Sequence, residues 1–567
     1  MKTWALAILI LVAATSSWAT TYYVNNCVSR SGENIGNDSN NGVSISTPWL
    51  TLAHVNAQTF HPGDSVRFEK TCTWRESLTV PSSGNSNNPI TFGAYGSGAN
   101  PIITGANNIT GFSVETSIVW DASVAARPSV VLVGATAPKA MAASKAAIAA
   151  PGDWYWAMGI LSVYSTSDPS GTVEAGARDN PVSTNNQTNI TLDSLDIKNG
   201  NLAFGSAHGT LKVGFTNVTG IVIQNSTIEG GSANGIDIHG TTTHDITINN
   251  NVIRNNGGWG IWVNNPGYTT GTISNNTVYG NGWASVTYNQ QFSGIQGYFG
   301  NFSIFGNTIY ANAPVCNNTA QCHGIYALAD TNIVKIYSNM IYGNVNGDGI
   351  KLIGSSTIYW NAIYSNAGAD IEVGQNGSTN VVYSIYSNII FANNTAGNSS
   401  GITEQTMGAG TLSLTIDNNT LYQNGGATQQ EVKVGDNVAR LTIRNNILYA
   451  TPTRRSLWAV LQSGTVSIDN NLHWRADGNP SIYYGGAQQS WAQWHALGFD
   501  TNGVNADPLL HNFVLTSGSP AIDAGANLGA TYEYGLDPAT SWPSGMVVDN
   551  QNYYGRGWEI GAFVYKP

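Results

Sequence analysis

The sequence predicts an elongated all-β solenoid, a parallel β-helix of about ten or more coils. Three observations support this fold class. An Asn two places before an aliphatic residue recurs between residues 251 and 471 at intervals of 22 to 32 residues. Before each Asn, apolar and polar residues alternate as in a β-strand. A second short strand of the form Gly-Ile-x-aliphatic usually follows. Repeats of this length with variable insertions are typical of solenoids.

The recurring Asn residues predict one stacked bend. Asn tolerates left-handed backbone conformations and can hydrogen-bond to the Asn one coil away. A β-propeller would need about 40 to 50 residues per blade, which is longer than the observed spacing. The positions are Asn251, Asn276, Asn307, Asn339, Asn361, Asn388, Asn419, Asn446 and Asn471.

The composition excludes several classes of protein. Charged residues make up 10% of the 567 residues, against about 25% in average proteins, which disfavours a helical bundle or coiled coil. With 17 Trp, 26 Tyr and 14 Phe, the chain can bury a large core, so disorder is disfavoured. The net charge is -11 and no basic stripe occurs, so nucleic acid is not an expected partner.

The first nineteen residues have the pattern of a secretory signal peptide. Lys2 is followed by an apolar run over residues 4–14 and by an A-x-A-like cleavage site that ends at Ala19. No later segment is apolar over the about 20 residues that a membrane span requires. We therefore expect a secreted, extracellular or periplasmic protein cleaved near Ala19.

Four cysteines agree with an oxidising compartment. Four cysteines allow three pairings, and the sequence cannot choose among them. Pairing within each region favours Cys27 with Cys72 and Cys316 with Cys322. A zinc site is disfavoured because no C-x-x-C motif occurs and the histidine near these cysteines is His323.

Motifs at both ends resemble the secreted right-handed parallel β-helix proteins of the pectate-lyase-like superfamily. The N-terminal motifs are Tyr22-Tyr23-Val24, Pro48-Trp49-Leu50, Pro62-Gly63-Asp64 and Asn88-Pro89-Ile90, and the C-terminal ones are Asp507-Pro508-Leu509, Ser519-Pro520-Ala521 and Glu559-Ile560-Gly561. The resemblance implies a right-handed solenoid and a carbohydrate-active protein, but these motifs recur in lyases, in hydrolases and in proteins of unknown activity.

We expect five segments in this chain. A signal peptide over 1–19 precedes an N-terminal cap with the first coils over 20–110. Residues 111–185, which include an Ala-rich stretch, form an insertion packed on the solenoid. The repeats occupy 186–475, and 476–567 form the last coils and a closing segment that covers the end of the solenoid.

The x position of each Gly-Ile-x-aliphatic strand is expected to point outward. In coil order this column is Asp237, Trp262, Gln296, Tyr326, Lys351, Glu372, Thr403 and Lys433. Two places further on, Tyr298 and His239 share the face. Trp262, Tyr298 and Tyr326 are candidate platforms for sugar rings, or a ladder that stabilises the sheet. Asp237 and His239 form a weaker candidate acid and base pair that would also contact substrate.

The densest chemistry lies in three consecutive coils. The candidate catalytic residues are His323, Asp348, Lys351, Asp370 and Glu372. Paired carboxylates supply the acid and the base or nucleophile of glycoside hydrolysis. The alternative is a ladder of compensating charges on a solvated face, with Lys351 against Glu372.

We therefore expect an extracellular carbohydrate-active enzyme that acts on a polysaccharide or oligosaccharide, with glycoside hydrolysis favoured. Hydrolysis needs no cofactor. The first alternative is a polysaccharide lyase, in which Lys351 with His323 or Lys433 is the base and Asp348 and Glu372 bind Ca²⁺. The second is a non-catalytic glycan-binding adhesion protein. We expect a monomer, and the sequence leaves a metal site undefined.

Overall fold

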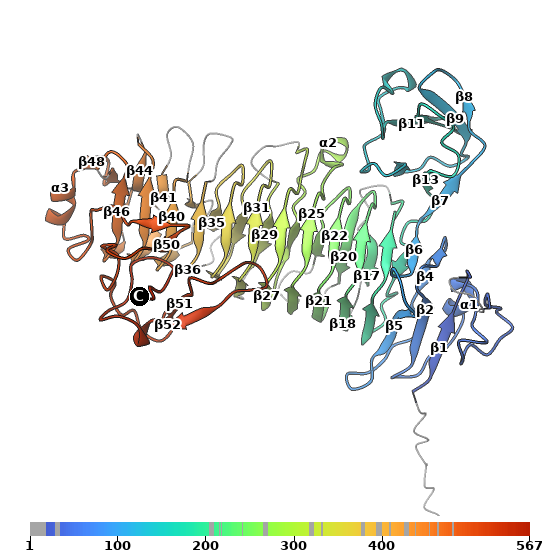
Figure 1. The fold of residues 1–567 in the computed structure, drawn as a ribbon, viewed down its shortest axis with the longest axis horizontal. Helices are drawn as coiled ribbons and strands as arrows, with labels where there is room; N and C mark the ends of the chain where they lie inside the picture. Colours follow the sequence, from blue (N-terminus) through green and yellow to red (C-terminus); the bar gives the residue numbers. More distant parts are fainter. Residues whose placement is uncertain are drawn as a thin grey trace, which may run out of the picture.

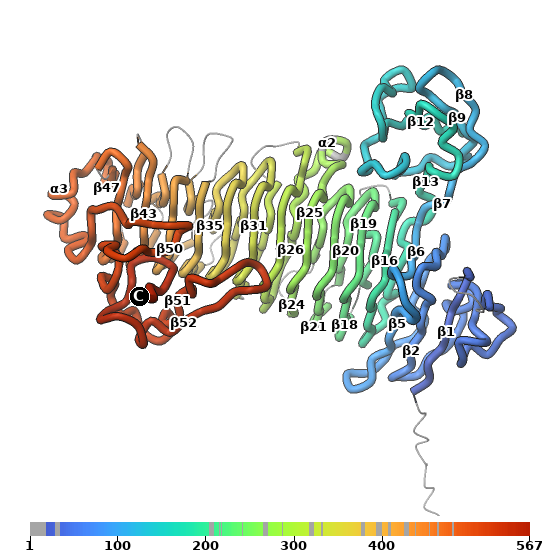
Figure 2. The backbone as a smooth tube through the Cα atoms, viewed as in Figure 1, coloured from blue at the N-terminus to red at the C-terminus, as the bar shows by residue number. Residues whose placement is uncertain are grey.

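The chain folds as a right-handed parallel β-helix, as predicted (Figure 1). The computed structural model describes residues 19–28, 34–202, 209–214, 216, 218–240, 242–264, 270–316, 322–329, 333–375, 380–392, 400–406, 410–424, 430–436, 438–452, 454–461, 464–478 and 481–567. The predicted signal peptide, apart from Ala19, lies outside these residues. Figure 2 shows successive coils following one another from one end of the solenoid to the other.

Three long sheets, here sheets A, B and C, form the sides of the solenoid. Sheet A contains fourteen strands: β1 (Thr21–Val24), β2 (Ser65–Glu69), β5 (Ile90–Tyr95), β15 (Ile190–Asp193), β18 (Thr219–Gln224), β21 (His244–Asn249), β24 (Gly271–Ser274), β27 (Phe302–Phe305), β30 (Val334–Tyr337), β33 (Ser356–Tyr359), β36 (Val381–Tyr386), β39 (Leu412–Asp417), β42 (Val438–Arg444) and β45 (Thr465–Asp469).

Sheet B contains thirteen strands: β3 (Thr73–Trp74), β6 (Ile102–Thr104), β16 (Asp196–Lys198), β19 (Thr227–Glu229), β22 (Val252–Arg254), β25 (Thr277–Tyr279), β28 (Thr308–Tyr310), β31 (Met340–Tyr342), β34 (Ala362–Tyr364), β37 (Ile389–Phe391), β40 (Thr420–Tyr422), β43 (Ile447–Ala450) and β46 (Leu472–Arg475).

Sheet C follows sheet B in each coil and carries the candidate site. It contains fourteen strands: β4 (Leu78–Thr79), β14 (Val182–Ser183), β17 (Gly209–Val213), β20 (Asn234–His239), β23 (Ile261–Asn264), β26 (Ile295–Tyr298), β29 (Ile325–Leu328), β32 (Ile350–Ile353), β35 (Ile371–Gln375), β38 (Ile402–Thr406), β41 (Gln430–Val434), β44 (Arg455–Ala459), β47 (Ile482–Tyr484) and β48 (Ala487–Gln489). Every pairing is parallel except that of β47 with β48.

Aliphatic side chains in register fill the interior. In sheet C, Ile236, Ile261, Ile295, Ile325 and Ile350 pair from coil to coil, and all are fully buried. Burying one such side chain stabilises the fold by about 1.5–3 kcal/mol. Because alternate residues point inward, the side chain between two buried aliphatics faces outward.

The predicted Asn ladder is confirmed at one bend. From Asn251 to Asn471, each Asn donates its Nδ2 proton to the Oδ1 atom of the next at 2.9–3.0 Å, and Asp500 accepts the last of these hydrogen bonds. The left-handed residue is the one before each ladder Asn, for example Asn250 with φ 55°. The side-chain amides of the ladder residues form hydrogen bonds with buried backbone groups.

A second ladder follows five residues after the first. Asn256, Asn281, Asn312 and Asn344 donate to the Oδ1 atom of the next ladder residue at 2.8–3.4 Å, and the series ends at Asn366. These side chains occupy the bend between sheets B and C and are fully buried. The two ladders fix the path of the chain on both sides of sheet B, and therefore the position at which sheet C begins.

The N-terminal region and an insertion precede the regular coils. Helix α1 (Leu52–Asn56) lies in this region, and a disulfide joins Cys27 and Cys72. The insertion forms antiparallel strands: β7 (Ala106–Ile109), β8 (Ser113–Val114), β9 (Val119–Ser123), β10 (Val131–Val133), β11 (Trp154–Ala157), β12 (Ile160–Tyr164) and β13 (Val173–Gly176), with a 3-10 turn at Lys145–Ala147. It begins earlier and ends earlier than the expected 111–185, because β7 pairs with β13 and β14 already belongs to sheet C.

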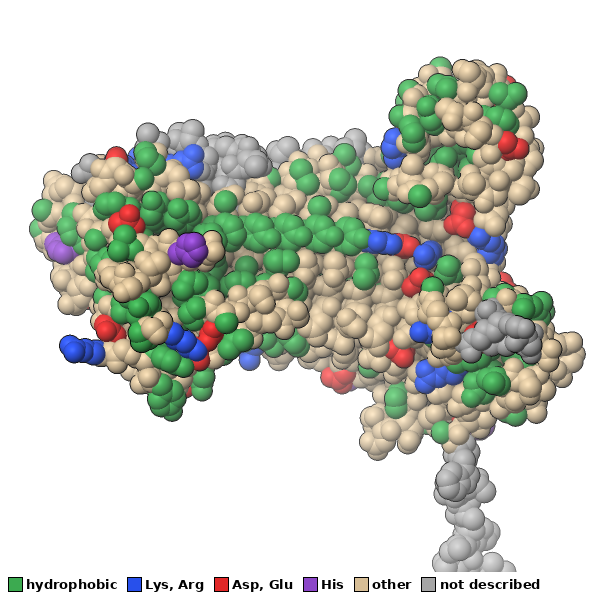
Figure 3. All heavy atoms as spheres, in the orientation of Figure 1, with side chains coloured by type: hydrophobic (Ala, Val, Ile, Leu, Met, Phe, Trp, Pro, Cys, Tyr) green, Lys and Arg blue, Asp and Glu red, His purple; other side chains and the backbone are tan. Residues whose placement is uncertain are grey.

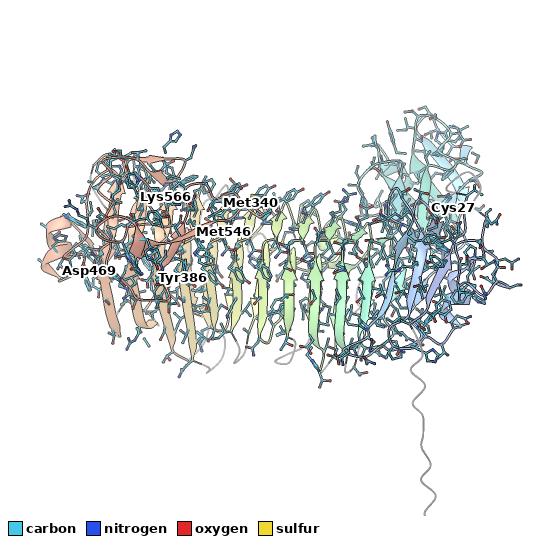
Figure 4. The ribbon with its side chains drawn as sticks, turned by 60° about the horizontal axis from the view of Figure 1, so that its bottom comes forward. Cys27, Met340, Tyr386, Asp469, Met546 and Lys566 are labelled. Carbon is cyan, nitrogen blue, oxygen red and sulfur yellow. A yellow bond between two sulfur atoms is a disulfide. The ribbon has the colours of Figure 1, made fainter. Side chains whose placement is uncertain are left out.

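The closing segment folds back along the solenoid instead of only extending it (Figure 1). It contains α3 (Trp491–Ala496), β49 (Leu510–His511), β50 (Val514–Leu515), β51 (Tyr534–Leu536), β52 (Val548–Asn550) and a 3-10 turn at Gln551–Tyr553. Figure 4 places Met546 and Lys566 over the C-terminal third, at the opposite end from Cys27.

Two features bear on the expected compartment. The second disulfide joins Cys316 and Cys322, so the described structure confirms both favoured pairings. None of the helices in the described ranges, which include the four-residue α2 (Ser285–Tyr288), is long and apolar enough to cross a membrane.

Candidate functional site

The outer face of sheet C carries the predicted column of side chains. Cα pairing joins Asp237, Trp262, Gln296, Tyr326, Lys351, Glu372, Thr403 and Lys433 in that order. The pairing extends the column to Lys212 before Asp237 and to Trp458 and Tyr483 after Lys433. The spacing of parallel strands is about 4.8 Å, so neighbouring members of this column contact each other.

A second column lies three residues before the first, at the bend from sheet B. It contains Trp259, Ser293, His323, Asp348 and Ala369, whose backbone carbonyls accept hydrogen bonds from successive coils. Its side chains also act on the next coil. Ser293 Oγ accepts the His323 N–H at 3.2 Å, and Asp348 Oδ1 accepts the Ala369 N–H at 2.7 Å. The second column therefore has fixed side-chain positions.

His323 and Asp348 are adjacent members of the second column. His323 Nδ1 lies 3.0 Å from Asp348 Oδ2 and accepts the Asp348 backbone N–H at 3.1 Å when the ring is neutral. A protonated ring would instead donate to Oδ2. No described atom hydrogen-bonds to His323 Nε2. A Cβ at Gly368 would approach Asp348 Oδ1 to 2.2 Å, so glycine is required beside this carboxylate.

Lys351 and Glu372 are adjacent members of the first column, and Lys351 Nζ lies 2.5 Å from Glu372 Oε1. Burial raises the pKa of Glu372 and the negative charge of Asp348 raises it further, whereas Lys351 opposes both effects. Burial alone would lower the pKa of Lys351, but the ion pair with Glu372 and the charge of Asp348 together raise it. The pair thus combines a carboxyl that retains its proton to a higher pH with a firmly protonated lysine.

These groups form one compact cluster, here the acid/base cluster: His323, Asp348, Lys351 and Glu372. It is buried, contrary to the solvated charge ladder that was the alternative expectation. His323 is fully buried, and the side chains of Lys351 and Asp348 are each 7% exposed, while that of Glu372 is 16% exposed. The Tyr326 ring packs edge-on against His323 at 5.3 Å. Charges at such low exposure have strong mutual effects because water screens them little.

Asp370 does not join the acid/base cluster, and the expectation that it shares this face is wrong. It occupies the position at which other coils have Gly349 or Gly324. Asn366, the last residue of the second ladder, donates Nδ2 to Asp370 Oδ1 at 3.2 Å. Asp370 is fully buried, so it is turned into the bend with the amide ladder. Spacing along one strand placed it beside Glu372, but its side chain ends a ladder that sequence reasoning had not identified.

Asp237 and His239 form a second polar cluster toward the N-terminal end of sheet C. Asp237 Oδ1 bonds to His239 Nδ1, and Asn234 Nδ2 donates to Asp237 Oδ2 at 2.6 Å. Asn264 Nδ2 lies 2.9 Å from His239 Nε2. Asp237 is buried and His239 half-buried, so the predicted pair is present. Both nitrogens of His239 are already engaged, which orients the ring firmly.

An aromatic wall separates the two polar clusters. Trp259 and Trp262 stack at 4.2 Å, and Tyr298 meets Trp262 edge-on at 6.4 Å. Trp259 Nε1 donates to Gln296 Oε1 at 2.6 Å, which ties the wall to the outer column. The sequence predicted Trp262 and Tyr298 but missed Trp259. Trp259 lies three residues before Trp262, as His323 lies three residues before Tyr326. This spacing was the feature of the sequence that could have predicted Trp259.

Two cavities lie on sheet B and not on the face of sheet C that carries the candidate residues. One of about 410 Å³ is lined by Lys198, Glu229 and Arg254, which neutralise each other at 2.8 and 2.5 Å. The other, of about 560 Å³, is apolar and lies between Phe391 and Trp542. Neither joins perturbed acids to half-buried aromatic rings as sheet C does, so we place the candidate site on sheet C. Among the described residues, no group of three or more His, Cys, Asp or Glu is placed to hold a metal ion.

Comparison with known proteins gives one short sequence match. No family model matches the chain. A stretch of 109 residues, 18% of this chain, is 35% identical to a lacto-N-biosidase of Bifidobacterium longum subsp. longum. The chain spans only 6% of that protein's length. The match therefore leaves the family of the whole chain open.

Several solved structures align with this chain at low identity. A complex of XylC with xylose has a TM-score of 0.39 at 14% identity and covers 77% of this chain and 70% of its own. Lacto-N-biosidase from Eubacterium ramulus scores 0.34 at 13% identity over 79% and 68% of the two chains. Pectate lyase Pel9A scores 0.35 at 14% identity over 97% and 98%. All three scores lie below 0.5, so no site residue or substrate follows from them.

Proposed function

We propose that this protein is an extracellular glycoside hydrolase that acts on an oligosaccharide or polysaccharide laid along sheet C. The observation that carries the proposal is the environment of Glu372. Its carboxyl is desolvated, faces outward, and lies one coil from a second carboxylate, Asp348, whose charge raises its pKa further. Two carboxyl groups whose surroundings differ in this way are the pattern of an acid paired with a nucleophile or base.

Each residue of the acid/base cluster has a role in this proposal. Glu372 donates its proton to the glycosidic oxygen as the bond breaks. Asp348 either attacks the anomeric carbon or activates water, held in place by the Ala369 N–H. His323 fixes the position of Asp348 through its Nδ1 atom. Lys351 holds the Glu372 carboxyl by a charge-assisted hydrogen bond. Tyr326 and the aromatic wall of Trp259, Trp262 and Tyr298 border the sugar.

The same geometry disfavours the lyase alternative. A lyase base must lose its proton near neutral pH, but the ion pair with Glu372 raises the pKa of Lys351. Glu372, engaged with Lys351, is also a poor choice as a calcium ligand. The Bifidobacterium match is with an enzyme named for the cleavage of a glycan, which agrees with hydrolysis. The two disulfides agree with an oxidising, extracellular location.

The first test is incubation of the full chain with a panel of neutral and acidic polysaccharides and oligosaccharides. New reducing ends without absorbance from unsaturated uronides would support hydrolysis. Absorbance from unsaturated uronides would show elimination and contradict the proposal. Binding without any new reducing ends would indicate a glycan-binding protein that uses the aromatic wall, and would also contradict it.

The second test assigns the two carboxyls on an aryl glycoside of the sugar that the panel identifies. A good leaving group needs no proton, so Glu372→Gln should retain aryl glycoside cleavage while losing about 10²–10⁴-fold on the natural substrate. Asp348→Asn should lose both activities. Glu229→Gln, a carboxylate of a sheet B ion pair, is the matched control and should retain both. Equal activity of all three variants on both substrates would move the site away from this cluster.

A further inference from the structure

The C-terminal end of sheet C carries two cations held against aromatic rings. Lys433 Nζ lies 5.6 Å from the centre of the Trp458 ring, and the Arg455 guanidinium lies 5.1 Å from the centre of the Tyr483 ring. The two rings are nearly parallel, with centres 5.9 Å apart and an angle of 9°. All four side chains are half-buried. We call this group the cationic patch: Lys433, Arg455, Trp458 and Tyr483.

Neither cation is neutralised by a carboxylate of the described residues, since none lies within 4.0 Å of Lys433 or of Arg455. The Arg455 Nε atom is buried and no described atom accepts its hydrogen bond. A ligand that supplies an acceptor to this N–H would gain a hydrogen bond that the described residues do not provide.

The carboxylates of the two adjacent sheet C strands have other partners. Glu431 accepts hydrogen bonds from Asn424, including one from Nδ2 at 2.7 Å. Glu404 accepts the Gly435 N–H at 2.8 Å. Lys351 and Arg254, two other cations of the outer columns, are paired with glutamates at 2.5 Å. The cationic patch is therefore unusual in a chain whose net charge is -11.

Cation–π contacts explain how the cations are held without being neutralised. An aromatic face attracts an ammonium or guanidinium group and fixes its position, yet it supplies neither a counter-charge nor a hydrogen-bond acceptor. The N–H donors therefore remain oriented and available. Such preorganised donors bind a carboxylate or sulfate well, because little side-chain freedom is lost on binding.

We propose that the cationic patch is a subsite for a sugar unit that bears a carboxylate or a sulfate. The patch belongs to the same outer column as the acid/base cluster, two and three strands beyond Glu372. At about 4.8 Å per strand, Lys433 and Trp458 lie roughly 10 and 14 Å along the column. A chain bound across Glu372 would reach the patch within a few sugar units. The inference rests on the proposed function only in taking the ligand to be a saccharide.

The test is calorimetric titration of the full chain in a Glu372→Gln background, which suppresses turnover. Three probes separate the ligand chemistries: an oligogalacturonate, the same oligosaccharide fully methyl-esterified, and a sulfated carrageenan oligosaccharide. Lys433→Gln and Arg455→Gln remove one charge each. Lys335→Gln removes an exposed cation on sheet A that forms no ion pair with another described residue, and it is the matched control.

We expect at least one anionic probe to bind about tenfold or more tightly than the esterified probe, and each patch variant to reduce that affinity by about tenfold. Added salt should weaken only the anionic binding, and Lys335→Gln should change nothing. Preference for oligogalacturonate identifies a carboxylate site, and preference for carrageenan a sulfate site. Equal affinity for charged and esterified probes, or unchanged affinity in both patch variants, would overturn the inference. Anionic binding at the patch without hydrolysis of any panel substrate would contradict the proposed function and leave this inference standing.

Discussion

Sheets B and C present two outer columns of the same length and spacing, but their contents differ. The sheet B column runs Lys198, Glu229, Arg254, Tyr279, Tyr310, Tyr342, Tyr364, Phe391, Tyr422, Tyr449 and Trp474. From Tyr279 to Phe391 the rings stack at 4.8–5.0 Å and within 12° of parallel. Figure 3 shows them as a continuous hydrophobic band that meets charged side chains near the insertion.

The difference distinguishes the sheet B column, whose side chains pack on one another, from the sheet C column, which carries the candidate site. Where like residues repeat, each ring covers the face of the next, so sheet B exposes ring edges and its side chains satisfy one another. The sheet C column changes residue type at nearly every coil, so its side chains face unlike neighbours. Desolvation and the charge of Asp348 then raise the pKa of Glu372. The ring stack of sheet B from Tyr279 to Phe391 contains no carboxyl on which such an effect could act.

The largest expected effect comes from breaking the same kind of ion pair on each face. Lys351→Met should lower the free energy of unfolding at neutral pH by about 4 kcal/mol, because it leaves the Glu372 charge buried and unpaired. Lys198→Met on sheet B should cost only about 1 kcal/mol, since Arg254 still pairs with Glu229. Urea titration measures both values. Loss of Lys351 also raises the pKa of Glu372, so the difference should shrink at acidic pH. Equal losses of unfolding free energy in the two variants would contradict the expected difference in burial between the two ion pairs.

The stability of a third region, the closing segment, should depend on pH through Glu559. Burial, with the charge of Asp523 adding, raises the pKa of Glu559 to about 7. Because the folded pKa exceeds the ordinary value of about 4.5, stability is greatest below pH 4.5 and falls as pH rises to 7. The loss should be about 3 kcal/mol, at roughly 1.4 kcal/mol per unit. Thermal unfolding of Glu559→Gln should lack this component, while Glu533→Gln, at a half-buried carboxyl of the same segment, should retain it.

The aromatic residues should separate stability from activity. Tyr342 stacks on Tyr310 and on Tyr364, so Tyr342→Ala should lower the free energy of unfolding by about 2 kcal/mol and leave kcat/KM unchanged. Tyr326→Ala, at the acid/base cluster, should instead raise KM. Chemical denaturation and steady-state kinetics of both variants test this separation. A loss of kcat/KM in Tyr342→Ala would show that sheet B contributes to the site.

The smallest effect is expected at Asp370. Asp370→Asn replaces one acceptor of the Asn366 amide by another, so the bend should persist. The free energy of unfolding should change by no more than about 1 kcal/mol, because the hydrogen bond from Asn366 is kept, and turnover should match that of the unmodified protein. Activity assays alongside Asp348→Asn make the comparison. Loss of turnover in both variants would assign Asp370 to the chemistry after all.

Much of the candidate site could be predicted because register in a parallel β-helix follows from the repeat. The sequence placed Tyr326, Lys351 and Glu372 in one column, and their Cα atoms pair in that order. It also placed His323 and Asp348 in adjacent coils. It missed Trp259 and misjudged Asp370, because both lie at the bend before sheet C. There the side-chain direction depends on the second Asn ladder and not on strand alternation.

The sequence by itself determined the fold, the first Asn ladder and the order of the outer column, and it favoured the two disulfide pairings that the structure contains. Each depends on a repeat or a separation that is local in the chain. Only the tertiary structure decided that the acid/base cluster is buried, that Asp370 turns away from it, and that no described carboxylate pairs with the cations of the C-terminal patch. The physical reason is that desolvation and pairing depend on the coils above and below, and those neighbours are 21 to 34 residues away in the sequence.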